Sequence, residues 1–220
     1  MGRLLVVLAL LMSPWATAAA QQRPPAEELA RSLQERYAKV RDFSADFVHS
    51  YRGGALRTKV TERGTMAVKK PGKMRWMYNQ PEEKTFVSDG AKIYSYIPAD
   101  RQVIVSTVPT GDEATTAVMF LAGKGDIARD FTASYAENAP AGTWALKLVP
   151  RKAERDYDTL VLALDPGTLQ IKALTTTDRQ GGESTFTFTN MKENRGLSDK
   201  DFTFRIPRGV DVITDGRVSS

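Results

Sequence analysis

The chain has no cysteine and a single histidine, and these two shortages limit its chemistry from the start. Without cysteine the protein cannot form disulfides, thiolate metal sites or a cysteine nucleophile, and it lacks the N-terminal cysteine on which a bacterial lipoprotein is acylated. A metal site with several imidazoles is excluded because His49 stands alone. His49 is in phase with Phe43 and Phe47 of an alternating pattern, so we interpret it as an ordinary strand residue.

Long apolar runs are also missing. The run Leu4 to Met12 has nine residues, whereas a helix needs about 20 to cross a bilayer. It follows a short basic start and precedes small residues, which is the pattern of a secretory signal peptide. We therefore predict a signal peptide over residues 1–20, cleaved near Ala18 or Ala20, and a single exported domain over residues 21–220.

Signatures of catalysis are absent as well. No Gly-x-Ser-x-Gly elbow, phosphate-binding loop or dinucleotide fingerprint occurs. Glu82 and Glu83 follow Pro81, but adjacent side chains point apart, so solvated charge explains them better than a catalytic pair. Asp89 precedes Gly90, and a turn accounts for it. A carboxylate site is the one enzymatic alternative left open; we predict no enzyme activity, no catalytic residue, no metal and no cofactor.

The charge balance is modestly basic, with 31 Lys and Arg against 26 Asp and Glu, a net charge of +5. Lys69, Lys70, Lys73 and Arg75 beside Trp76 resemble a nucleic-acid patch. Export separates the protein from nucleic acid, so we expect no such partner. A solvated basic face is the simpler interpretation, and attraction to acidic partners or an anionic membrane surface is the alternative.

The elements that the sequence predicts are one helix and many strands. Leu29, Leu33, Tyr37 and Val40 recur at spacings of four, four and three, which indicates an amphipathic helix with one buried stripe. Alternating segments separated by turn signals then follow about every 8–12 residues, the last at Phe202 to Ile206. This pattern predicts one large antiparallel sheet or barrel of about ten or eleven strands.

One apolar segment interrupts the strands, between about residues 110 and 131. Asp112 can cap a helix in which Val118 and Leu121 share a stripe, widened by Phe120. Glycines end this helix, and a second short helix can follow. The segment predicts a small helical lid over the sheet, and a permanent plug is the alternative.

Large apolar side chains are concentrated between residues 68 and 98. Met74, Trp76 and Tyr78 alternate with Lys73, Arg75 and Met77, and Asp89-Gly90 indicates a hairpin between two further strands. A sheet with an aromatic face must pack that face against its own core or against a ligand.

Several short motifs, taken in order and spacing, carry a resemblance that covers nearly all of the chain beyond the signal peptide. They are Asp42-Phe43-Ser44-Ala45-Asp46-Phe47, Gly64, Lys70-Pro71-Gly72-Lys73-Met74-Arg75-Trp76, Gln80-Pro81, Val87-Ser88-Asp89-Gly90, Phe202-Thr203-Phe204, Pro207 and Gly209-Val210. Together they resemble the outer-membrane lipoprotein carrier protein (LolA) family of the Gram-negative periplasm. The missing N-terminal cysteine separates the chain from the related outer-membrane acceptor, which is itself a lipoprotein.

The resemblance implies a mainly β fold: an unclosed antiparallel barrel of about eleven strands, with an N-terminal helix and a short helical lid. It also implies a monomeric periplasmic carrier without a cofactor. Such a carrier binds the acyl chains of lipoproteins released by an inner-membrane ABC transporter and delivers them to an outer-membrane acceptor. A periplasmic module that senses lipid or lipoprotein, a carrier of another lipid, and an exported scaffold with a solid core are the alternatives.

Alternation and resemblance together predict which side chains line the acyl-chain site, although for each one alone ordinary core is the simpler interpretation, since a sheet needs a core anyway. The predicted acyl-chain-binding residues are Phe47, Met74, Trp76, Phe86, Tyr94 and Tyr96 from the sheet, and Val118, Phe120 and Leu121 from the lid. In the family, an arginine before the loop proline hydrogen-bonds the lid backbone. The matching residue is Lys70, which we predict to be a weaker or differently arranged lid latch because lysine lacks the rigid fork of arginine.

Overall fold

The computed structural model describes residues 23–53, 59–108, 121, 123, 125–154, 157–214 and 217–219. The predicted signal peptide and its cleavage sites lie outside these residues, as do Val118 and Phe120 of the predicted acyl-chain site.

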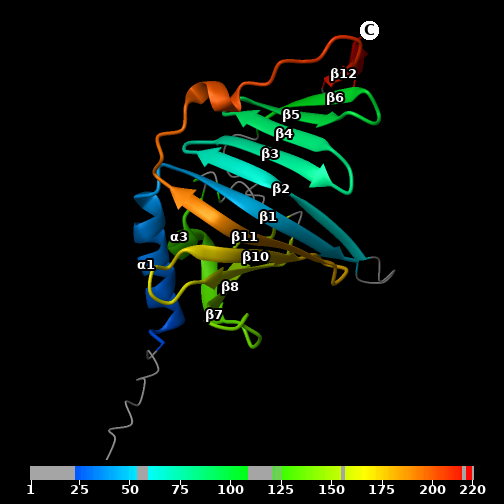
Figure 1. Ribbon diagram of the computed structural model, residues 1–220. Coiled ribbons are helices and arrows are strands. Elements are labelled where there is room, and N and C mark those ends of the chain that lie inside the picture. The colour runs from blue at the N-terminus through cyan, green and yellow to red at the C-terminus, as the bar shows by residue number, and fades with distance from the viewer. Residues whose placement is uncertain are drawn as a thin grey trace, which may run out of the picture.

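All the strands of the described residues belong to one sheet (Figure 1). The first half of the chain gives β1 (Asp42–Arg52), β2 (Lys59–Lys69), β3 (Lys73–Gln80), β4 (Lys84–Asp89), β5 (Lys92–Ile97) and β6 (Gln102–Thr107). The second half gives β7 (Phe131–Tyr135), β8 (Trp144–Pro150), β9 (Thr159–Leu164), β10 (Ile171–Thr177), β11 (Glu183–Glu193), β12 (Asp211–Thr214) and β13 (Arg217–Ser219). The helices are α1 (Ala26–Ala38), α3 (Ile127–Asp130) and the 3-10 helix η1 (Asp199–Phe202).

The strand order is β13-β12-β6-β5-β4-β3-β2-β1-β11-β10-β9-β8-β7. Two meanders, β1–β6 and β7–β11, therefore join where β1 pairs with β11. Neighbouring strands are antiparallel except β12 and β6, which run parallel. Because β7 and β13 lie at opposite edges of this order, the sheet is not closed by pairing among the described strands.

The predicted fold class is confirmed: the protein is mainly β, with an unclosed sheet and an N-terminal helix. Two details differ from the prediction. The sheet has 13 strands within the described residues rather than about eleven. The strand predicted at Phe202 to Ile206 is wrong: η1, which begins at the capping box of Ser198 and Asp201, ends at Phe202, and residues 203–206 form no strand. The chain then re-enters the sheet later, as β12 beside β6.

Helix α1 packs its predicted stripe against the core. Leu29, Leu33, Tyr37 and the following Val40 are all buried, as predicted. The helix lies beside α3 and across β7 and β8, at one end of the curved sheet (Figure 1). We call the face of the sheet that α1 and α3 cover the inner face, and the opposite face the outer face.

The main core lies between the inner face and these helices. Side chains alternate between the two faces of a strand, and cross-strand partners share a face. The register therefore assigns every second residue of each strand to the inner face, including Phe47 of β1, Trp76 of β3 and Leu162 of β9. All three belong to one continuous cluster of buried apolar residues.

Candidate functional site

An aromatic cluster occupies the middle of the inner face. The ring centroid of Phe47 lies 5.1 Å from that of Trp76, 4.8 Å from that of Tyr78 and 6.0 Å from that of Phe186. Trp76 and Phe186 are themselves 5.1 Å apart. The four rings, which we call the aromatic centre, come from β1, β3 and β11 and so join the two meanders. Such edge-to-face contacts add to the stabilisation from burial alone.

A second group of apolar side chains extends the inner face toward α1. These residues are leucines of β8, β9 and β10 that alternate along their strands and are almost completely buried: Leu146, Leu148, Leu160, Leu162, Leu164 and Leu174. We call them the leucine wall. None of these leucines is among the predicted acyl-chain-binding residues, since leucine at alternate positions of a strand is equally typical of an ordinary core.

Charged and polar residues gather at the other end of the inner face. His49 Nδ1 donates to Glu62 Oε2 at 3.0 Å, since an ionised carboxylate can only accept. Lys84 Nζ donates to Glu62 Oε1 at 2.8 Å, and His49 Nε2 lies 2.9 Å from the Ser184 hydroxyl. We call these four residues the polar end. They come from four strands, and neither spacing nor motif in the sequence indicated that they meet.

The electrostatics of the polar end favour an ionised Glu62. Burial raises the pKa of this carboxyl, but the hydrogen bonds from Lys84 and His49 together outweigh it and hold the pKa below its usual value. The His49 ring stacks on Phe186, with centroids 4.1 Å apart. The polar end is therefore attached directly to the aromatic centre.

The structure brings four of the predicted sheet residues to the inner face. Phe47, Met74, Trp76 and Phe86 lie there by register, and the first three are buried. Leu121 of the predicted lid is buried in the same core cluster.

Tyr94 and Tyr96 lie on the outer face, contrary to the predicted arrangement. Phe86 of β4 pairs with Ser95 of β5, so Ser95 shares the inner face and its two neighbours point the other way. Both tyrosine rings pack on Phe204: the ring centroid of Phe204 lies 5.5 Å from that of Tyr94 and 5.9 Å from that of Tyr96. These two residues therefore contribute to a separate apolar contact outside the sheet.

The predicted latch Lys70 lies where β2 ends, against α1. Its Nζ donates to the backbone oxygen of Tyr37 and lies 3.5 Å from the centre of that ring, a cation–π contact. Its stem approaches Gly123 so closely that a Cβ there would lie 2.7 Å from Lys70 Cδ. Burial lowers the pKa of Lys70 to about 8, although Glu193 opposes this effect.

Tyr37 makes a hydrogen bond to the predicted lid segment. Its hydroxyl donates to the backbone oxygen of Leu121 at 2.6 Å, in a buried position. Burial raises the pKa of Tyr37, so this hydroxyl stays protonated and remains a donor at physiological pH. Among the described residues, Lys70 supports Tyr37, and Tyr37 binds Leu121.

Removing this hydroxyl with Tyr37→Phe is expected to loosen the backbone near Leu121. One buried hydrogen bond contributes about 1 kcal/mol, so amide exchange in a peptide spanning residues 121–127 should accelerate about fivefold. Tyr135→Phe is the matched control, because the Tyr135 hydroxyl also donates to a backbone oxygen, that of Pro24, at 2.8 Å. Exchange–mass spectrometry showing equal rates in both variants would contradict a role for Tyr37 at this segment.

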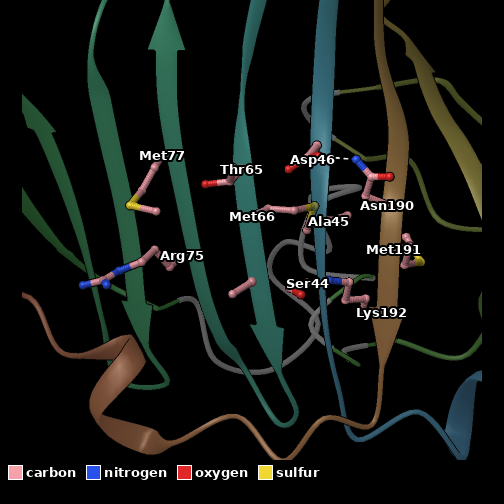
Figure 2. Close-up of a pocket in the computed structure, with 11 residues that line it drawn as sticks. Ser44, Ala45, Asp46, Thr65, Met66, Arg75, Met77, Asn190, Met191 and Lys192 are labelled. Atoms are coloured by element: carbon pink, nitrogen blue, oxygen red, sulfur yellow. Dashed lines mark hydrogen bonds between the residues drawn. The ribbon is translucent and has the colours of Figure 1, made fainter.

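A groove of about 620 Å³ lies on the outer face, across β3, β2, β1 and β11 (Figure 2). Its lining includes Arg75, Met77 and Lys192, and a hydrogen bond of 2.6 Å joins Asn190 to Asp46 within it. Because charged and amide groups line it, this groove suits an acyl chain less well than the inner face does.

The described residues contain no group of three or more His, Asp or Glu placed to hold a metal ion. None of the helices among them is both long and apolar enough to span a bilayer.

Comparison with known proteins agrees with this architecture. The family model described as "Outer membrane lipoprotein carrier protein LolA" matches residues 38–205. An outer-membrane lipoprotein carrier protein of Bordetella avium is 31% identical over 195 residues, covering 86% of this chain and 90% of that protein. Another, from Chromohalobacter salexigens, is 31% identical over 193 residues and covers 87% of each. An uncharacterised conserved protein from Thermus thermophilus has a similar fold, with a TM-score of 0.52 at 13% identity over 86% of this chain and 98% of that one. The match over most of the sequence shows that this chain belongs to the outer-membrane lipoprotein carrier protein LolA family.

Proposed function

We propose that the protein is a periplasmic carrier that binds the acyl chains of lipoproteins on its inner face. It receives them from an ABC transporter that releases them from the inner membrane, and it delivers them to an acceptor at the outer membrane. No covalent step belongs to this cycle. Residues 1–20 act as the export signal, removed near Ala18 or Ala20, and the rest functions as one monomeric domain.

The observation that supports this proposal is the construction of the inner face. The aromatic centre and the leucine wall form one apolar surface, and α1 and α3 cover its end at β7 and β8. Each methylene transferred from water is worth about 0.8 kcal/mol, so a chain of about 16 carbons gains roughly 12 kcal/mol gross. Because acyl chains must first displace existing contacts of the inner face, part of this gain is lost, and release to an acceptor remains feasible.

Native mass spectrometry of the protein from residue 21 onward, mixed with a triacylated lipopeptide, tests the proposal. The expected result is an adduct of one lipopeptide per chain, with none formed by the same peptide after deacylation. Absence of any adduct would mean that the inner face is a permanently filled core, and the carrier function would be rejected in favour of a scaffold.

A further inference from the structure

Trp76 has an unsatisfied hydrogen-bond donor inside the core. The residue is only 4% exposed, and its indole Nε1 has no hydrogen-bond partner among the described residues. Buried donors of this kind are uncommon, because an unpaired polar group loses its hydration without compensation. The neighbours of Trp76 are apolar: the rings of Phe47 and Phe186 pack against the indole, and Met66 and Phe86 are its cross-strand partners.

The position of Trp76 along the inner face is as informative as the missing partner. Toward the β2–β3 hairpin, the next inner-face residue of its strand is Met74, which is buried and apolar. In the opposite direction comes Tyr78, whose pKa is raised by burial and by the nearby charge of Glu62. Trp76 thus lies at the transition from apolar residues to the polar end.

We propose that the Trp76 indole N–H donates a hydrogen bond to an ester carbonyl of the bound lipid. The ligand is then an ester-linked diacylglyceryl group, oriented with its chains along the leucine wall and its glycerol toward the polar end. This inference rests on the proposed carrier function and adds a chemical requirement to it, because a hydrocarbon chain alone leaves the donor unsatisfied. A site with a buried donor discriminates against analogues that lack the acceptor.

Two synthetic lipopeptides test this requirement directly. Both carry two saturated chains of equal length on the glyceryl thioether of an N-terminal cysteine with a free amine, so that neither has an N-acyl amide. One joins its chains by esters and the other by ethers, which lack the carbonyl oxygens. The wild-type protein is expected to bind the ester about three- to tenfold more tightly than the ether, the range expected for one buried hydrogen bond.

Two phenylalanine variants assign the preference to a residue. In Trp76→Phe, the ester-to-ether ratio of affinities should fall to about one. Trp144→Phe is the matched control, because Trp144 is also buried on the inner face but its indole nitrogen is not among the fully buried, unsatisfied atoms, and the ratio should stay at its wild-type value. A ratio near one in the wild type, or an unchanged ratio in Trp76→Phe, would overturn the inference.

A spectroscopic measurement covers the case in which Trp76→Phe does not fold. In the Trp144→Phe protein from residue 21 onward, Trp76 provides the single indole N–H resonance. The ester ligand should shift this proton downfield, and the ether should shift it much less; equal shifts would overturn the inference. Failure of both lipopeptides to bind would instead reject the carrier function. The carrier function and the Trp76 hydrogen bond can therefore be rejected independently of each other.

Discussion

Gly64→Ala is expected to lower the free energy of unfolding by about 3 kcal/mol or more, at the upper end of overpacking effects. A Cβ at this position would lie 2.0 Å from the Met77 backbone oxygen and 2.8 Å from Cζ of Phe47. The oxygen belongs to the neighbouring strand, so relief requires β2 and β3 to separate locally. The Phe47 ring packs against Gly64, so the added methyl group would also displace this ring and disturb the aromatic centre.

Gly167→Ala is the matched control for this prediction. A Cβ at Gly167 would find its nearest neighbour, Asp165 Oδ1, at an ordinary 3.6 Å. Its effect should therefore stay within about 1 kcal/mol, as expected for a tolerated surface change. Urea unfolding followed by circular dichroism measures both variants, and equal midpoints would show that β2 and β3 tolerate a side chain at Gly64.

The inner-face phase of β1 and β3 could be predicted because the alternation there is unambiguous. Phe43 and Phe47 alternate with polar residues, and Met74 and Trp76 alternate with Lys73 and Arg75. In each strand, one face is buried in the core and the other is more polar, so the residue types alone distinguish the two faces.

The phase of β5 could not be read in the same way, because both of its faces are apolar. Ile93 packs against the inner-face core, while Tyr94 lies in the opposite phase. The segment that follows β11 covers the outer face there and buries Phe202, with Phe204 over the tyrosines. Since that segment is distant in sequence, nothing within residues 92–97 indicates that an outer-face aromatic will be covered.

The polar end could not be predicted for a related reason. His49, Glu62, Lys84 and Ser184 each follow the alternation of their own strand, and each alone is unremarkable there. Only the register of β1 with β2 and β11 brings His49, Glu62 and Ser184 together. Sequence patterns define the face of a residue, whereas clusters that join several strands depend on register between distant segments.

A negative charge on the inner face is expected to abolish lipid binding, whereas one on the outer face should not. Phe86→Asp introduces a carboxylate beside Trp76, on the surface that the acyl chains are proposed to cover. Burying that carboxylate under hydrocarbon costs several kcal/mol, so affinity for the triacylated lipopeptide should fall at least about a hundredfold. Phe86 is only partly buried, so the folded protein should tolerate the change better than it would at Trp76. Fluorescence titration with the lipopeptide measures the affinity.

Met77→Asp provides the comparison that separates a local effect from a general charge effect. Met77 is adjacent to Trp76 in the same strand but lies on the outer face with 44% of its surface exposed. The same added charge should change the affinity less than about twofold, because it remains hydrated. If both variants bind like the wild type while circular dichroism shows an intact fold, the chains do not occupy the inner face. If Met77→Asp alone loses binding, the outer groove is the lipid site.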